Sequence, residues 1–393
     1  MTPYISVAGA LFMLALVEAG APPKRRLWGV IALLIVLAFG TLRFETGFDW
    51  VAYAEEFKDI PSIVAAIEDG IQEPHIPMET LFIWLNVVIK TFTEDVTVLF
   101  AVAALFGIVS IHEVTGKISR SQCLMWLVYF CLTFLPAQMS SIRAAITASL
   151  VLIGLALAAR EKPGRGLALI LTANGFHTFS AAFLVLPLLR KTSPSIRWLL
   201  VPLLTLGFIC LLVGVQAADR LIDLTSPFLP GFASEKLALF YQGVNAPLSK
   251  ATLVLIAGHL TMLYLLCTDR NATHDPFIVI GIWLTFMILM AHLFLSGLPA
   301  IWNRIMYVSL PWEIACLGRI DIFVRAGVAM KRTIILGIGS MSVVGLVYFL
   351  LSPASLPFVP YQSIIEVWLT GNYGDGPQRS WEWYTIYQEG LRD

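Results

Sequence analysis

Apolar runs of about the length of a membrane span fill most of this chain. A helix needs about 20 mainly apolar residues to cross the hydrocarbon core of a bilayer. The 393 residues contain twelve such segments, several of them short for a full crossing. Only 13% of the residues are charged, whereas soluble domains carry about 25%. The sequence therefore predicts an all-α polytopic membrane protein and excludes a soluble enzyme. The segments are residues 3–20, 27–42, 78–92, 96–112, 121–137, 141–159, 166–189, 198–216, 250–267, 276–296, 300–317 and 333–351.

The positively charged residues indicate how these segments are oriented, because Lys and Arg are retained on the cytoplasmic side of a membrane. If all twelve segments cross, the 26 lysines and arginines are divided equally between the two sides. If segments 78–92 and 166–189 enter the membrane without crossing it, most of these residues lie on the cytoplasmic side. The first is short for a span, and the second is interrupted at Asn174 and Gly175. We therefore expect about ten crossing helices and two half-segments, within one transmembrane domain over residues 1–351.

This topology collects three arginines beside apolar segments on the extracytoplasmic side, namely Arg43, Arg143 and Arg304. An arginine at bilayer depth costs at least about 2.5 kcal/mol, so such residues normally face a cavity or an anionic partner. Arg143 and Arg304, each taken alone, also fit interfacial anchors. Together the three arginines predict an anionic ligand at the outer membrane face. The parts expected outside the cytoplasm are the loops 43–77 and 217–249 and the C-terminal tail 352–393.

The loop that follows the second apolar segment carries a possible binding platform. Gly47 permits a turn with positive φ, and Asp49 is a good N-cap for a helix over residues 50–58. Trp50 and Tyr53 lie on that helix. With Asp49 they would form an aromatic and carboxylate face that suits a sugar or a phosphate. Alternatively, the helix is an amphipathic element at the membrane interface.

Glu79 follows two prolines and lies in the first turn of segment 78–92. An acid at this place can compensate the positive end of the helix dipole. Alternatively, it is a carboxylate held at the membrane boundary with a raised pKa, which suits the removal of a proton from a substrate. Both interpretations fit the sequence.

Further polar residues adjoin the apolar segments. Gln138 and Arg143 flank the start of a segment rich in small residues, where an arginine and free backbone N–H groups can bind a phosphate together. His177 follows the Asn-Gly break, although a lone histidine in a membrane segment is more often a packing residue. Arg304 and Tyr307 lie on one helix face, as a ligand-binding pair or as interface anchors.

Several signatures of other activities are missing from the sequence. It has no GxSxG, HExxH, Walker or GxGxxG motif in a supporting context, no Asp-x-Asp motif and no histidine pair at ligand spacing. We therefore expect no metal and no cofactor. The 5 cysteines lie in apolar runs and are expected to be buried and unpaired. The 26 basic and 26 acidic residues cancel, so nothing indicates a nucleic-acid partner.

Taken in order, these motifs resemble those of the EpsG family, the Wzy-like polymerases of bacterial exopolysaccharide, over roughly residues 25–310. The family's Arg-Phe/Tyr…Gly-x-Asp-x-x-x-Tyr-x-x-x-Phe segment is matched by Arg43, Phe44, Gly47, Asp49, Tyr53 and Phe57. Glu79 matches the Glu that opens the next hydrophobic stretch. Gln-x-Arg corresponds to Gln138 and Arg143 with a looser spacing, or to Ser141-Ile142-Arg143, which leaves Gln138 out. His177 to Ala181 carries one residue more than His-x-Ser-Ala, and Arg304 with Tyr307 has one fewer than Arg-x-x-x-Tyr.

The resemblance implies a GT-C-like glycosyltransferase that joins undecaprenyl-diphosphate-linked oligosaccharide repeat units at the periplasmic face of the bacterial inner membrane. Arginines would stabilise the diphosphate leaving group, foremost Arg143 and Arg304 and then Arg43. The base would be Asp49, Glu79 or His177. The remaining contacts to diphosphate or glycan would come from Gln138, Tyr53, Tyr307 and Trp50. Implied partners are the lipid-linked donor and acceptor, membrane lipids, and a chain-length regulator and flippase of the same pathway.

Other functions share part of this pattern. An O-antigen-ligase-like enzyme, or another glycosyltransferase with a lipid-linked donor, would use the same arginines and a different acceptor. A flippase or transporter would favour inverted repeats and charges at mid-membrane, and we find no repeat in the sequence. An acyltransferase has weaker support, since His177 lacks a partner motif.

In the polymerase, the loop 217–249 with Tyr241, Gln242 and Asn245 is expected to cover the acceptor glycan.

Overall fold

The computed structural model describes residues 1–21, 25–71, 74–119, 121–192, 200–207, 250–269, 275–295 and 298–390. Over these ranges the regular structure is helical, and the only strand-type pairing is an isolated antiparallel bridge between Arg43 and Ser363. The predicted all-α class is confirmed. The first helices are α1 (Thr2–Gly20), α2 (Arg25–Thr41), α3 (Trp50–Asp59), α4 (Ile63–Glu68), α5 (Thr80–Lys90), α6 (Val96–Ile118), α7 (Gln122–Tyr129), η2 (Phe130–Phe134), α8 (Leu135–Gln138) and α9 (Ile142–Ala159). They are followed by α10 (Pro163–Asn174), η3 (Thr178–Phe183), α11 (Leu186–Leu189), α15 (Lys250–Thr268), α16 (Pro276–Phe294), α17 (Pro299–Leu317), α18 (Asp321–Arg325), α19 (Val328–Leu351), η6 (Pro353–Ser355), α20 (Ile364–Thr370) and α21 (Gly376–Gly390).

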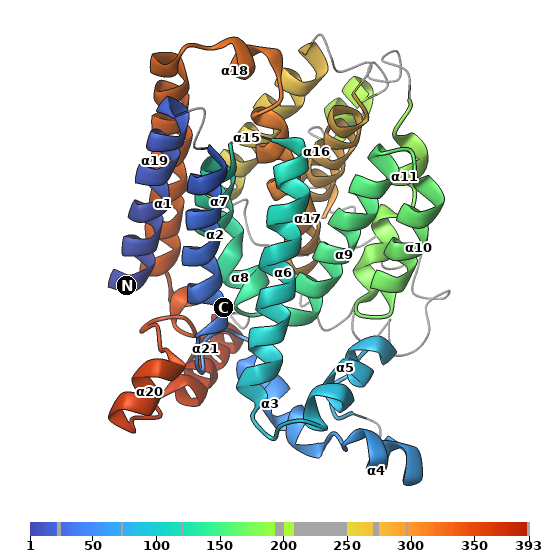
Figure 1. The fold of residues 1–393 in the computed structure, drawn as a ribbon, viewed down its shortest axis with the longest axis vertical. Coiled ribbons are helices and arrows are strands. Elements are labelled where there is room, and N and C mark those ends of the chain that lie inside the picture. Colours follow the sequence, from blue (N-terminus) through green and yellow to red (C-terminus); the bar gives the residue numbers. More distant parts are fainter. Residues whose placement is uncertain are drawn as a thin grey trace.

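The long helices run side by side in one bundle (Figure 1). Five of the described helices are long and apolar enough to cross a membrane, namely α1, α6, α9, α16 and α19. Shorter apolar helices include α15 and the run from α7 to α8. This run passes through the π-helical turn η2 just before Pro136, whose missing N–H would otherwise break the helical hydrogen bonds. The architecture agrees with a polytopic membrane protein.

The two segments that were expected to enter the membrane without crossing are a short helix and a broken one. Helix α5 has 11 residues and lies with α3 and α4 at the lower end of the bundle in Figure 1. In the other segment, α10 ends at Asn174 and the chain continues as the short turns η3 and α11. Lys191 Nζ lies 3.3 Å from Glu161 Oε1, so the chain returns to the side from which α10 started. Residues 163–189 therefore form a hairpin.

Basic residues gather at the opposite end of the bundle, where Figure 1 shows α18. Arg25 opens α2, Lys117 lies in the last turn of α6, and Arg325 ends α18. These residues belong to the loops that the sequence assigns to the cytoplasmic side. The segments assigned to the other side, including α3, α4 and the C-terminal α20 and α21, share the lower end (Figure 1).

The C-terminal segment, residues 352–390, packs against α2 and the chain that follows it. The ring of Tyr361 stacks on Phe39 at 4.3 Å between centroids, and its hydroxyl donates to the Phe39 carbonyl at 2.9 Å. The N–H of Phe44 donates to the Gln362 carbonyl at 3.0 Å. The part of the predicted tail that is described is thus folded onto the body. The loop 217–249, with Tyr241, Gln242 and Asn245, lies outside the described residues.

Candidate active site

A turn after α2 delivers Asp49 to the start of α9. Gly47 has φ +118°, and a Cβ atom there would lie 1.9 Å from the Met139 carbonyl oxygen, so the predicted glycine turn is confirmed. Asp49 is the N-cap residue of α3, as predicted, but its side chain makes no capping hydrogen bond. Instead, Ser141 Oγ donates to its carboxylate at 3.2 Å, and its own N–H donates to Ser140 Oγ at 3.3 Å. Asp49 is therefore held against the loop between α8 and α9.

Arg143 lies in the first turn of α9 and is fixed by three acceptors. Its Nε donates to Tyr53 Oη at 2.9 Å. Its Nη1 donates at 2.9 Å to both the Pro77 carbonyl and Glu79 Oε2. No residue in the described part of the chain accepts a hydrogen bond from its Nη2. The guanidinium is mostly buried, yet it keeps N–H groups for a further acceptor.

Glu79 joins Arg143 to the tip of the α10–η3 hairpin. It is the N-cap residue of α5, one position before the first turn in which it was expected. While Oε2 binds Arg143, Oε1 accepts from the N–H of Thr178 at 3.3 Å and lies 3.5 Å from His177 Nδ1. His177 is only 4% exposed, and it is the N-cap residue of η3. Both carboxylate oxygens of Glu79 are thus occupied by residues of the protein.

Three arginines surround Asp49 electrostatically. Burial raises the pKa of Asp49 above its usual range, while the positive charges of Arg143, then Arg304 and Arg43, and the hydrogen bond from Ser141 oppose this rise. The structure therefore brings together the three arginines that the sequence singled out, around one carboxylate. We call Asp49, Tyr53, Glu79, Arg143, His177 and Arg304 the arginine cluster. Arg43 lies outside it and acts on Asp49 through its charge.

The neighbours of the cluster complete its geometry. Tyr53 is 5% exposed, and burial raises the pKa of its phenol to about 12, so it remains a hydrogen-bonding hydroxyl at neutral pH. Tyr307, one turn along α17 from Arg304, lies beside Arg304 and Ser141. Arg304 itself is only partly buried. The expected Arg304–Tyr307 pair thus lies next to Asp49.

Two candidate residues are placed elsewhere. The ring of Trp50 stacks on Phe100 at 3.9 Å and is 4% exposed, so it belongs to the core and offers no platform to a sugar. The Gln138 amide donates to Tyr129 Oη at 3.0 Å and is buried within the bundle. This position favours the alignment that matches the Gln-x-Arg motif to residues 141–143.

Arg43 reaches the site by charge rather than by contact. It is 1% exposed, with its guanidinium carbon 4.9 Å from the centre of the Phe100 ring. Burial lowers its pKa to about 9. One of its nitrogens donates to the Thr46 carbonyl at 3.5 Å, whereas Nε and Nη2 find no acceptor among the described residues.

The residues that orient this cluster were not predicted from the sequence. Ser140 and Ser141 hold Asp49, and the Pro77 carbonyl holds Arg143. The two serines just before Arg143 were the available signal, since the contact crosses more than 90 residues of chain and no local pattern encodes it. Among the described residues, no group of three or more His, Cys, Asp or Glu side chains could hold a metal ion.

Comparisons with known proteins identify the family to which the chain belongs. Neither the curated proteins nor the solved structures contain a match to the chain. A sequence model described as the EpsG family, however, matches residues 26–363, a range that contains every residue of the arginine cluster. Because this match covers most of the chain, the protein belongs to the EpsG family, the Wzy-like exopolysaccharide polymerases.

Proposed function

We propose that this protein polymerises undecaprenyl-diphosphate-linked oligosaccharide repeat units at the periplasmic face of the bacterial inner membrane. The observation that carries the proposal is the arginine cluster at one end of an apolar helical bundle. Ser141 holds Asp49 there and Glu79 holds Arg143, while the positive charges of three arginines act on the Asp49 carboxylate. Membership of the EpsG family supports a membrane polysaccharide polymerase. The fold would be GT-C-like, and a flippase and a chain-length regulator would act beside it.

The arginines suit the departure of a diphosphate. The reaction breaks the bond between the anomeric carbon of the donor glycan and a diphosphate oxygen, and the electron pair of that bond leaves with the diphosphate. A guanidinium stabilises this charge through paired N–H donors. Arg143 retains Nη2 for that purpose, and Arg304 is the partly exposed neighbour that completes the site. Arg43 is buried and contributes its positive charge only.

Asp49 is the base that the geometry favours. The acceptor hydroxyl bonds to the anomeric carbon and releases its proton, which the base takes up. Both oxygens of Glu79 are already engaged by Arg143 and Thr178, and the His177 ring is 4% exposed. Asp49, by contrast, is partly exposed and can be reached by a substrate. The burial that it has raises the pKa of its carboxyl, which makes it a stronger base. Glu79 and His177 then orient Arg143 and the hairpin.

The test is a size-resolved assay with purified protein in lipid nanodiscs, supplied with lipid-diphosphate-linked repeat units. We expect a ladder that grows by whole repeats with the wild type and disappears with Asp49→Asn. Transfer of one glycan to a different acceptor, without a ladder, would identify a ligase instead. Movement of the substrate across a vesicle membrane without elongation would identify a transporter. Either of these two results would overturn the proposal.

A further inference from the structure

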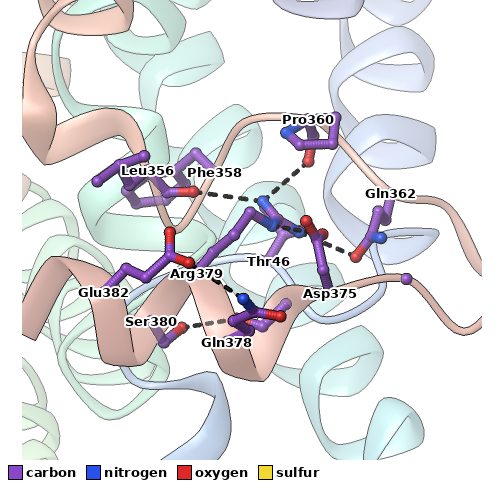
Figure 2. Close-up of polar contacts among 12 residues, drawn as sticks. Thr46, Leu356, Phe358, Pro360, Gln362, Asp375, Gln378, Arg379, Ser380 and Glu382 are labelled. Atoms are coloured by element: carbon purple, nitrogen blue, oxygen red, sulfur yellow. Dashed lines mark hydrogen bonds and ion pairs between the residues drawn. The ribbon is translucent and has the colours of Figure 1, made fainter.

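Arg379, in α21, is buried and connects several parts of the C-terminal segment through hydrogen bonds. It is 5% exposed and makes four hydrogen bonds, which Figure 2 shows. Its Nε donates to Asp375 at 2.7 Å, and its Nη2 donates to Gln362 Oε1 at 2.9 Å. Its Nη1 donates to the carbonyls of Leu356 and Pro360 at 3.3 and 3.1 Å. One side chain thus ties α21 to the extended chain between α19 and α20.

Arg379 binds residues 356–362, and the same residues also form hydrogen bonds with the loop of residues 42–49, which ends at Asp49. The carbonyl of Gln362 accepts the N–H of Phe44 at 3.0 Å. The carbonyl of Pro357, next to Leu356, accepts the N–H of Gly47 at 2.9 Å. Two of the four acceptors of Arg379 are therefore close to the loop: Gln362 bonds to it directly, and Leu356 precedes Pro357, which does so.

Close packing reinforces these hydrogen bonds. Phe48, next to Asp49, has its ring 4.5 Å from Trp383 and 5.0 Å from Phe358. A Cβ atom on Gly376, the first residue of α21, would lie 2.3 Å from Glu45 Cβ. The backbone of α21 therefore touches the loop, and only a residue without a side chain fits there.

The loop is consequently fixed on two sides. The segment from α8 to α9 holds Asp49 through Ser140 and Ser141, and the C-terminal segment holds Phe44 and Gly47. If the C-terminal contacts loosened, one of these two supports would be lost. A displacement of about 1 Å in a reacting group can cost on the order of 100-fold in rate.

We propose that Arg379 is a positioning residue that fixes the loop of Asp49 through the C-terminal segment. This inference rests on the proposed function, in which Asp49 takes up the proton. It adds to the working site Arg379, which lies beyond residues 26–363, the range matched by the family. An arginine suits the position because its planar fork serves four acceptors at once, which the single ammonium of a lysine does not.

The experiment compares Arg379→Ala and Arg379→Lys with Arg325→Ala in nanodiscs. Arg325 is a matched control, since it also donates to an aspartate four residues earlier, Asp321 at 2.9 Å, but is exposed at the other end of the bundle. Amide hydrogen exchange of peptides covering residues 42–49 reports on the loop, and steady-state kinetics report on the reaction. Arg379→Lys keeps the charge and serves if the alanine variant fails to insert.

We expect about tenfold faster exchange in residues 42–49 and at least about tenfold lower kcat for both Arg379 variants, with the KM for donor within about threefold. Arg325→Ala should match the wild type in both measurements. Unchanged exchange in the loop would overturn the inference, and so would faster exchange with kcat within about twofold of the wild type. A wild type that produces no ladder would refute the proposed function instead, while the exchange data would still decide whether Arg379 holds the loop.

Discussion

Arg143 Nη1 and Glu79 Oε2 lie 2.9 Å apart, and this ion pair joins the first turn of α9 to the residue that precedes α5. Each side chain is 11% exposed, so the pair is largely shielded from water. It aims the guanidinium while leaving N–H groups free for an anion. We therefore propose that Glu79 orients Arg143, which is one of the roles that the sequence allowed, together with that of the base.

Removal of the Arg143 guanidinium should abolish polymer formation. We expect Arg143→Ala to lower the elongation rate by at least about 100-fold, as for the loss of one donor to a developing negative charge. Arg143→Lys should lose at least about tenfold, because an ammonium cannot reproduce the planar fork. Size-resolved product analysis measures both. Arg160→Ala, at the exposed far end of the same helix, should leave the ladder unchanged.

Glu79→Ala should destabilise the protein as well as inactivate it. Breaking a buried ion pair leaves an uncompensated charge, at a cost of about 3–5 kcal/mol. Glu79→Gln should cost less, since an amide oxygen still accepts from Arg143. Thermal unfolding in detergent measures the difference as a fall in Tm. Glu113→Gln is the control, because its pair with Lys117 is exposed and 3.9 Å long. Equal Tm values for Glu79→Ala and Glu113→Gln would contradict a structural role of the pair.

The helical class and most apolar segments could be predicted from the sequence because hydrophobicity is a local signal. The break after Asn174 was predictable for the same reason, and the structure ends α10 there. The three arginines were identifiable because a charge beside an apolar run is costly. Their meeting around Asp49 was not encoded locally, since it depends on how α9 and α17 pack.

Contacts between residues far apart in the sequence explain where the structure places Trp50 and the C-terminal segment. Trp50 was placed on a binding face because tryptophan suits sugars, but its partner Phe100 lies on α6, about fifty residues away in the chain. The C-terminal segment was expected only as a tail, because its contacts with residues 42–48 join opposite ends of the sequence. Neither pairing leaves a periodic pattern.

The pH dependence of elongation should report on Asp49. Burial raises the pKa of this carboxyl, and the base must be unprotonated, so activity should fall as the pH is lowered through a midpoint above the ordinary aspartate value of about 3.9. Stability depends on pH in the opposite direction. Because folding favours the protonated Asp49 carboxyl, its contribution to the free energy of unfolding is lost as the pH rises through the raised pKa. Asp49→Asn should therefore lose activity at every pH while keeping or gaining Tm at neutral pH. An acid limb that persists unchanged in the residual activity of Asp49→Asn would exclude Asp49 as its origin.

Gly47 offers the sharpest test of how the loop is placed. Gly47 and Gly70 both have positive φ, +118° and +81°, so alanine is strained at either position. A Cβ atom at Gly47 would also meet the Met139 carbonyl at 1.9 Å, whereas nothing lies within 4 Å at Gly70. We expect Gly70→Ala to cost about 1 kcal/mol and to leave elongation intact. Gly47→Ala should cost more and lower kcat at least about tenfold, because the turn must move away from Met139 and carry Asp49 with it. If Gly47→Ala folded and elongated like Gly70→Ala, the position of Asp49 would not depend on this turn.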